Sequence, residues 1–562
     1  MDTIDHSKEV RVELASLTTK PSSKSLQDEM SLQDNSEQVV HREYLTGWRL
    51  HVLTLCICLS IFLPNIEVSI VSTALVNITN DLHGFSQTGW VIVNYLVTYT
   101  VQAFIIIWAK ISDIIGRKKT LATSLVIFTA FSGGCGASQT ITQLIICRAL
   151  QGVGAAGCFS IATIVIFEMA PKEKYPIYGT IISADVALAT ALGPILGGLI
   201  TGKTTWRWVF ILNVPAGIVT MILLFLSMPS GFPHQGNSAK GQPGLYPKLS
   251  MASFLRIDFP GTLLLLGASF LFVTSLLETS TRFSWGSPTT ISLLVLSGVF
   301  LIAFLFWERH ITISSSQQEP IFPWRFVHNR AWMGMLFASL LLGVPFTVLV
   351  VNIPQKFQTV KGLSPLQAGI RLLPYALVAP IGSFMANGIM SKTKKYPPVF
   401  LVLVGAILQV LGLALYCGLD TGIDVRKSQY GFQAIAGFGL GISFGTLVLM
   451  TPFSVDPQDL ATGTGAMVQF RQLGSAIGLS VAESLMNSQL TSKLSSVLAA
   501  EQLAALLETT TVVNRFPPEL KTRVIGIFAG AYGLQIKVVT AFAAVEVLVV
   551  MLILKRKQIR VG

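Results

Sequence analysis

The chain has 562 residues, of which 51% are hydrophobic and only 12% are charged, and its formal net charge is +12. A soluble domain carries about 25% charged residues, so this composition excludes a wholly soluble protein and favours one built for a lipid bilayer. The excess Lys and Arg lie in short loops and tails, which indicates membrane orientation and argues against a partner nucleic acid.

The first segment, residues 1–47, is polar and lacks any apolar period, so we expect a disordered cytoplasmic tail. An N-terminal bundle of six helices is predicted over 48–228, and a second bundle of six over 331–555. The intervening 229–330 is predicted to form cytoplasmic linkers around two additional membrane helices. A cytoplasmic tail, 556–562, is expected to end the chain.

The apolar runs are each about as long as the ~20 residues that cross a bilayer, so the sequence predicts an all-α integral membrane protein with fourteen transmembrane helices. A long external loop is expected at 488–529, where two short helical periods occur. The predicted spans lie near 49–71, 89–108, 121–138, 143–168, 178–200, 208–228, 259–277, 288–307, 331–352, 369–390, 398–417, 430–451, 462–486 and 530–554.

The turn between the second and third predicted spans reads AKISDIIGRKKTL, residues 109–121. Its three consecutive cations are typical of cytoplasmic loops, and Gly116 permits a positive φ. Asp113 precedes Arg117 by four residues, a spacing that lets the two side chains meet on one helical face. The string resembles the loop signature GxLSDRxGRKxxL of the major facilitator superfamily. The resemblance implies a conformational gating loop that includes Asp113, Gly116, Arg117 and Lys118.

Four basic residues fall at membrane depth, where a charge costs at least ~2.5–3.5 kcal/mol and normally faces a bundle interior. Arg371 and Lys537 lie close enough to span ends to reach the interface. Arg148 opens RALQGVGAAG, which resembles the fourth-span signature RxxQGxGAA of proton-coupled facilitators. The resemblance implies a role in proton transfer, and a purely structural contact with a backbone carbonyl is the alternative. Arg471 lies in FRQLGSAIG, which resembles the penultimate-span signature of fourteen-span drug antiporters.

The fifth predicted span contains LGPILGG. Pro194 bends the helix, while Gly193, Gly197 and Gly198 let a neighbouring helix approach closely. The string resembles the antiporter signature GxxxGPxxGG of exporting facilitators, with Ala189 in place of the first Gly. The resemblance implies an antiporter bend, and ordinary helix packing is the alternative.

Two further strings extend this resemblance along the chain. WRWVFILNVPAG, residues 206–217, resembles the sixth-span element of fourteen-span drug:proton antiporters, and 354–375 resembles the matching region of fungal members. Together the motifs cover about 49–555. They imply a major facilitator fold with two six-helix bundles and two extra linking helices.

Acidic residues inside the spans are candidates for carrying the coupled proton. Glu67 lies where the family's LDxTIVxxALP element has Asp, and a buried carboxyl of either type can hold a proton. We hypothesise that Glu67 titrates during transport, with Arg148 as a fixed charge. Asp185 could bind a cationic substrate, serve as a second proton site or pair with Arg148, and Glu483 is a weaker candidate.

Aromatic, amide and cationic side chains within the spans are candidates for lining a substrate cavity, although helix packing would also explain each one. They are Tyr95, Gln102, Asn352, Tyr375, Gln469 and Arg471.

The resemblance implies a proton-coupled secondary active transporter that exports a small amphipathic organic compound, such as a fungal toxin, specialised metabolite or drug, by alternating access. We expect a monomer in the plasma membrane, with the vacuolar membrane as an alternative, and the proton gradient in place of a cofactor. No P-loop or metal-ligand spacing indicates an enzyme. The alternatives are a siderophore or vacuolar basic amino-acid transporter of similar fold, and a transporter-like receptor or sensor.

Overall fold

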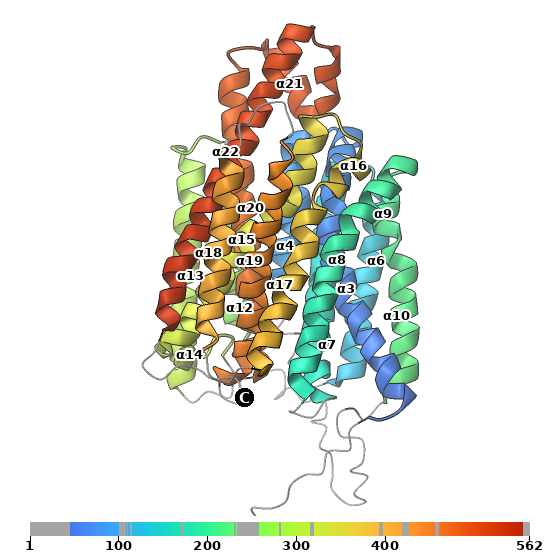
Figure 1. The fold of residues 1–562 in the computed structure, drawn as a ribbon, viewed down its shortest axis with the longest axis vertical. Coiled ribbons are helices and arrows are strands. Elements are labelled where there is room, and N and C mark those ends of the chain that lie inside the picture. The colour runs from blue at the N-terminus through green and yellow to red at the C-terminus, as the bar shows by residue number, and fades with distance from the viewer. Residues whose placement is uncertain are drawn as a thin grey trace, which may run out of the picture. The chain divides into compact units, whose positions relative to one another are not determined.

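The structure is a computed structural model, and its described residues are almost entirely helical (Figure 1). A helix pairs its backbone N–H and C=O groups within one segment, which is what a chain in hydrocarbon requires. No β-strand occurs within the described residues. These residues are 45–100, 108, 111–112, 115–169, 174–229, 232, 258–279, 283–314, 318, 320–392, 397–418, 426–455 and 460–554.

The N-terminal half packs its first helix at the centre of a helical bundle. Helix α3 contacts α8, α7 and α10, while α6 packs on α7 and α10, and α4 packs on α7. Pro64 inside α3 and Pro194 inside α8 remove one backbone hydrogen bond each, which accommodates bends in these long helices. The helices are α3 (Trp48–Asp81), α4 (Thr88–Thr100), α6 (Arg117–Ala137), α7 (Ile141–Glu168), α8 (Tyr175–Lys203), α9 (Arg207–Ile211) and α10 (Asn213–Ser227).

The C-terminal half repeats the pattern, because α15 packs on α20 and α22, and α19 packs on α17 and α18. Pro345 and Pro354 lie inside α15, as Pro64 lies inside α3. The helices are α14 (Trp324–His328), α15 (Arg330–Thr359), α16 (Pro365–Ile370), α17 (Leu373–Lys392), α18 (Val399–Cys417), α19 (Ser428–Met450), α20 (Leu460–Leu494), α21 (Ala500–Glu508) and α22 (Pro518–Val550).

Both halves share one distinctive contact. The Tyr95 hydroxyl of α4 donates to the carbonyl of Pro64 at 2.9 Å, and the Tyr375 hydroxyl of α17 donates to the carbonyl of Pro345 at 3.4 Å. In each half, a buried tyrosine therefore binds the first helix beside its proline. This contact marks corresponding positions in the two bundles.

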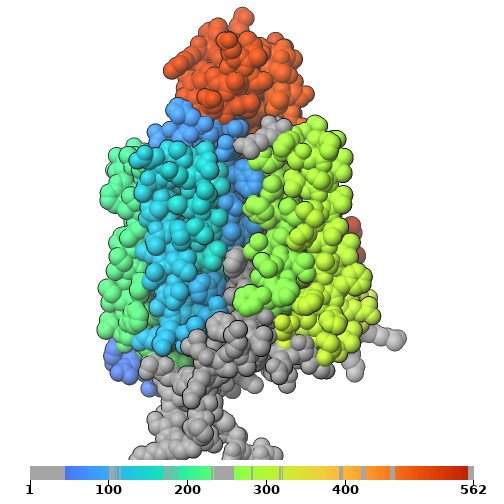
Figure 2. All heavy atoms as spheres, turned by 180° about the vertical axis from the view of Figure 1, so that it is seen from behind, coloured from blue at the N-terminus to red at the C-terminus, as the bar shows by residue number. Residues whose placement is uncertain are grey.

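Two extra helices, α12 (Phe259–Glu278) and α13 (Pro288–Ile313), pack on each other between the halves in the sequence. Helix α12 also contacts α4 and α20, so it touches both halves. In Figure 2, α12 and α13 occupy one side of the visible face, and α6 and α7 occupy the other. The hydroxyl or carboxylate N-caps at Asp258 and Ser287 explain where the two helices begin.

Twelve of the described helices are long and apolar enough to cross a membrane, so the count of fourteen remains a prediction. The other two predicted spans fall on α4 and α20. Helix α4 is described over 13 residues, and residues 101–107 lie outside the described part. Helix α20 has 35 residues, but many of them are Gly, Ser, Thr or Gln.

Segment 488–529 contains the end of α20, helix α21, a short 3-10 helix (Thr510–Arg515) and the first turns of α22. Leu494, Leu498 and Leu506 are buried in a separate small core with Phe528 of α22. We call this segment the cap. Its helices lie beyond the ends of most others in Figure 1.

The cap binds the end of α3 through one side chain. The Asn80 Oδ1 atom accepts hydrogen bonds from the Thr510 backbone N–H at 3.0 Å and from the Thr509 hydroxyl at 2.9 Å. The rings of Phe85 and Phe528 lie nearby, with centroids 6.3 Å apart. Asn80 therefore connects the C-terminal half's cap to the N-terminal half at this end of the bundle.

Replacing Asn80 with Ala should loosen this connection, because each lost hydrogen bond contributes about 0.5–1.5 kcal/mol. We expect backbone amides of Thr510–Arg515 to exchange hydrogen roughly tenfold faster, as measured by mass spectrometry. Asn514→Ala is the matched control, since Asn514 is exposed and accepts only from Lys521 within the cap. Unchanged exchange in Asn80→Ala would show that Asn80 does not hold the cap.

Candidate functional site

An ion pair lies inside the N-terminal bundle, between α3 and α7. The Arg148 Nη1 atom lies 2.6 Å from the Glu67 Oε1 atom, and both side chains are 0% exposed. The two residues are 81 positions apart in sequence, and the fold alone brings them together. The structure thus joins two of the three residues predicted for proton coupling.

Every other contact of this pair also comes from the N-terminal half. The Asn213 side chain of α10 donates to Glu67 Oε2 at 2.5 Å, so both carboxylate oxygens have a partner. Arg148 also donates to the Val91 carbonyl and the Gln151 side chain, each at 3.0 Å, and its guanidinium lies 4.2 Å from the centre of the Tyr95 ring. The Arg148 Nη2 atom has no hydrogen-bond partner in the described residues.

This arrangement joins two opposite charges through one pair of buried atoms. Removing one partner from a buried ion pair typically costs about 3–5 kcal/mol, because the remaining charge is left in a low dielectric. Protonation of Glu67 would remove its negative charge and weaken its bond to Arg148 without removing either side chain. The pair therefore links the ionisation of one carboxyl to the packing of α3, α7 and α10.

Asp185, the third predicted coupling residue, lies on α8 and is not paired with Arg148. Its Oδ2 atom is buried without a hydrogen-bond partner in the described residues. Of the roles proposed from the sequence, pairing with Arg148 is thus not found. Glu483 of α20 is 4% exposed, and its side chain would contact a Cβ built on Gly89 of α4, so it lies at a contact between the halves.

Arg117 of the predicted gating loop forms an ion pair with a residue that is distant in the sequence. The Arg117 Nη2 atom lies 2.7 Å from the Glu168 Oε1 atom at the end of α7, and Arg117 also contacts Ser112. Gly116 has a φ of +100°, which favours glycine. Lys118 Nζ donates to the Phe225 and Met228 carbonyls at the end of α10, at 3.0 and 2.6 Å. Asp113 lies outside the described residues.

Neutralising Glu168 as Gln should lower transport by about tenfold while leaving membrane insertion intact, because it removes a charge-assisted link between α6 and α7. Transport in inverted vesicles and surface abundance would be measured together. Lys119→Gln, an exposed cation on the same turn, is the control. The exchange Arg117→Glu with Glu168→Arg should recover part of the activity, and full activity in Glu168→Gln alone would remove the gating role.

The predicted antiporter bend lies between two neighbours. A Cβ on Gly193 would lie 2.7 Å from Ser69 Cβ of α3, and one on Gly197 would meet Ile70 of the same helix. On the other side, a Cβ on Gly198 would lie 2.7 Å from the Leu366 backbone N of α16. Helix α8 therefore contacts its own half through Gly193 and Gly197 and the opposite half through Gly198.

Gly369 supports the same contact between the halves. A Cβ on Gly369 of α16 would meet the backbone carbonyl of Pro194. The backbones of α8 and α16 therefore lie close together at Pro194. The bend is thus a close backbone contact between the N-terminal and C-terminal halves. A larger side chain here would have to separate them.

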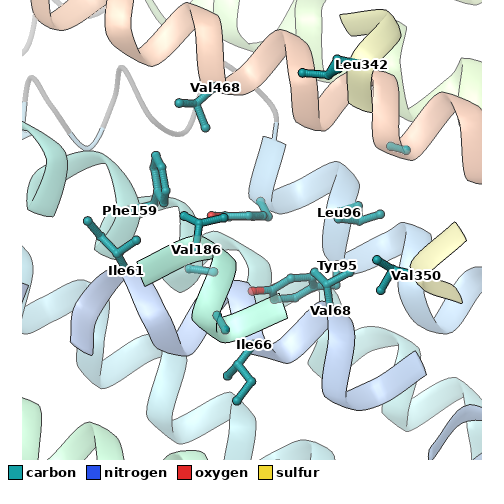
Figure 3. Packing of buried hydrophobic residues seen from close by; sticks show 14 of the residues in the cluster. Ile61, Ile66, Val68, Tyr95, Leu96, Phe159, Val186, Leu342, Val350 and Val468 are labelled. Carbon is teal, nitrogen blue, oxygen red and sulfur yellow. The ribbon is translucent and has the colours of Figure 1, made fainter. Parts of the chain in front are cut away.

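A mostly apolar pocket lies where α8 meets α15, α17, α19 and α20. Thr190 contributes from α8, and Leu342, Tyr375, Phe444 and Arg471 are among the residues lining the rest. Figure 3 shows the apolar packing around this region, with Val468 and Leu342 on one side and Phe159 and Val186 on the other. Two of the predicted cavity residues, Tyr375 and Arg471, thus line one pocket.

The other predicted cavity residues are distributed elsewhere. Tyr95 lies beneath the Arg148 guanidinium. The Asn352 side chain donates to Gln535 of α22, and both amide atoms of Gln469 are buried without a hydrogen-bond partner in the described residues. Gln102 lies outside the described part of the chain.

Three buried or paired side chains were not identified from the sequence. Glu168 ends the fourth predicted span on the same side of the membrane as the gating loop. This position could have indicated that Glu168 pairs with a cation of the loop. Asn213 lies within WRWVFILNVPAG but was not assigned a contact. Glu546 is the single acid in the apolar run AFAAVEVLVV of α22, and its fully buried carboxylate has no hydrogen-bond partner in the described residues.

Comparison with known proteins places these features in a family. Residues 57–479 match the family model for the Major Facilitator Superfamily. The chain is 41% identical to the MFS-type transporter FPY5 of Fusarium mangiferae, over 92% of this chain and 85% of that protein. It is 29% identical to the MFS thioclapurine efflux transporter tcpA of Claviceps purpurea, over 88% of each chain.

Solved structures share the fold. A bacterial homologue of the human lysosomal transporter Spinster, in an inward-facing and unoccupied conformation, superposes with a TM-score of 0.62 at 15% identity, covering 90% of this chain and 98% of that one. The sequence motifs, the membrane-length helices and the similarity to these relatives all indicate the same family of transporters. The chain therefore belongs to the major facilitator superfamily, as a multi-pass membrane transporter and not an enzyme.

Proposed function

We propose that this transporter is a proton-coupled exporter of a small amphipathic organic compound. The observation that carries this proposal is the buried Arg148–Glu67 pair, because an ionisable pair at membrane depth marks proton relays in transporters. The similarity to tcpA of Claviceps purpurea, an efflux transporter, supports export as the direction. A fungal toxin, another specialised metabolite or a drug would be the substrate.

The coupling scheme uses one proton on one carboxyl. When the bundle opens to the outside, a proton binds the Glu67 carboxylate and neutralises it, and Arg148 keeps its charge. The weakened pair lets α3, α7 and α10 repack, which favours the state open to the cytosol. Release of the proton to the cytosol restores the ion pair. The substrate binds when the bundle is open to the cytosol and leaves when it is open to the outside, so it moves in the direction opposite to the proton.

Contacts between the halves support an assignment of this structure to the state closed at the cap. The Gln358 side chain of α15 donates to the Thr73 carbonyl of α3 at 3.0 Å, and Asn80 binds Thr510 as described. The Gly198–Leu366 contact adds to them. If the cap is external, as the distribution of Lys and Arg predicts, these contacts close the outer side.

We further propose a monomer in the plasma membrane that uses the proton gradient and no cofactor.

The test uses inverted membrane vesicles that contain the full chain. An acidic lumen should drive accumulation of compounds from an organic extract of a fungal culture, identified by mass spectrometry, and collapse of the gradient with a protonophore should abolish it. Vesicles without the chain are the control. Accumulation that persists after the gradient collapses would contradict proton coupling, and accumulation of no compound would contradict export.

A further inference from the structure

The pocket between the halves contains a buried cation that has no carboxylate partner within the described part of the chain. Arg471 of α20 is 3% exposed and lines this pocket. It makes no ion pair or hydrogen bond within the described residues, and its Nε atom is buried without a partner. Among the described residues, none that lines the pocket is Asp or Glu. A buried charge of this kind is costly unless something compensates it.

Aromatic rings hold the guanidinium without neutralising it. The Arg471 Cζ atom lies 5.2 Å from the ring centre of Phe346 and 5.0 Å from that of Phe444. Such cation–π contacts offset part of the cost of burial and fix the position of the group. They leave the N–H donors of the guanidinium, which form a planar fork that matches a carboxylate.

Arg148 provides an internal comparison. It is also a buried arginine beside aromatic rings, but it binds Glu67, Gln151 and the Val91 carbonyl. The chain therefore neutralises one buried guanidinium with its own carboxylate, whereas the other has no carboxylate partner within the described residues. A partner from outside the chain would have to fit a pocket whose remaining walls, including Leu342 and Tyr375, are mainly apolar or aromatic.

We propose that Arg471 is the counter-charge for the transported compound, and that this compound is an amphipathic organic acid. Its carboxylate, or an equally acidic oxygen group, binds the Arg471 fork. The pocket has a volume of only about 40 Å³ in this structure, so the apolar body packs on Phe346, Phe444 and Tyr375 once the two halves have moved apart. An organic cation would meet a like charge in a low dielectric and is disfavoured. The inference rests on the proposed function, since it names the substrate class of that transporter.

The position of the pocket suits this role. Val186 and Thr190 belong to α8 of the N-terminal half, whereas Arg471 and the aromatic residues belong to the C-terminal half. A bound acid would therefore contact both halves, whose relative positions must change during alternating access. Helix α8 also carries Gly198, which contacts α16, so the same helix lines the pocket and forms the antiporter bend.

The test measures binding by the purified full chain in nanodiscs, with no gradient present. The probes are naphthaleneacetate, an aromatic carboxylate, and naphthaleneacetamide, its neutral counterpart of similar shape. We expect the wild type to bind the carboxylate at least about tenfold more tightly than the amide, because a charge-assisted hydrogen bond is stronger than a neutral one. Arg471→Gln should remove that preference.

Two variants separate ligand binding from structure. Arg471→Lys should keep part of the preference, because it retains the charge without the planar fork. Arg371→Gln is the matched control, since Arg371 contacts Tyr430 and does not line the pocket. Arg471→Gln should also keep or raise the melting temperature without ligand, since an uncompensated buried charge is removed, and it should lose stabilisation by naphthaleneacetate.

Three results would overturn the proposal. One is a wild type that shows no saturable binding of naphthaleneacetate, or that binds the amide equally well. Another is an Arg471→Gln variant that keeps the preference for the carboxylate. The third is a fall in melting temperature with loss of binding of both probes, which would indicate a structural role. Because no gradient is used, these results are independent of the vesicle test of proton-coupled export.

Discussion

Arg148→Ala is expected to abolish accumulation driven by a pH gradient in inverted vesicles. The substitution leaves the Glu67 carboxyl buried without its cation, so proton binding at Glu67 can no longer make and break the ion pair. Glu67→Gln, which cannot ionise, should also remove the dependence on the gradient. Arg148→Lys should rescue poorly, because Lys lacks the planar fork that binds Glu67, Gln151 and the Val91 carbonyl together.

Loss of folding could imitate loss of coupling, so a double variant is needed. Breaking one partner of a buried pair costs about 3–5 kcal/mol, whereas replacing both partners is often nearly neutral. Arg148→Met with Glu67→Gln should therefore melt closer to the wild type than Arg148→Ala does, yet remain uncoupled. Arg309→Ala, an exposed arginine on α13, is the control for the substitution itself. Gradient-dependent accumulation by Arg148→Ala at the wild-type level would refute the coupling role of this pair.

Gly198→Leu is expected to give either loss of export or an uncoupled proton leak. Even a Cβ at this position would lie 2.7 Å from the Leu366 backbone N and 2.8 Å from the Pro365 carbonyl oxygen. These are backbone atoms of the opposite half, so the halves would have to separate. Overpacking typically costs about 1–3 kcal/mol, which changes a balance between access states by roughly fivefold to more than a hundredfold.

The same helix offers a matched control and a second test. Gly202 has nothing within 4 Å of an added Cβ, so Gly202→Leu should transport normally. Gly193→Leu would press on Ser69 and Ile70 of α3, within one half, and should reduce export by disturbing the bundle that holds Glu67. Substrate efflux and proton leak would be measured in the same vesicles. Normal efflux with no leak in Gly198→Leu would show that the bend does not gate.

The positions of the membrane helices were largely predictable from apolar runs. Helix α12 begins at Phe259 and α13 at Pro288, as the sequence indicates. Helix α22 instead begins at Pro518, well before the predicted start at 530. The prediction missed its first turns because they are polar and lie in the cap. Hydropathy detects the part of a helix that crosses lipid and cannot detect its polar extension.

The partners within the site were harder to predict. Sequence motifs named Glu67 and Arg148 but could not choose between Glu67 and Asp185 as the acid beside Arg148, because that choice depends on how α3 and α8 rotate against α7. Arg117 shows the same limit, since its partner Glu168 is 51 positions away and helical spacing considers only local neighbours. The predicted pairing of Arg117 with Asp113 stays a prediction, because Asp113 lies outside the described residues.

Substrate-driven proton movement tests the central claim most directly. The full chain would be placed in proteoliposomes that enclose a pH-sensitive dye, with no gradient imposed at the start. Addition of a compound that accumulates in the vesicle test should move protons opposite to that compound in the wild type, and Glu67→Gln should transport it without moving protons or not at all. Substrate transport by the wild type with no proton movement, or proton movement that persists unchanged in Glu67→Gln, would contradict the account.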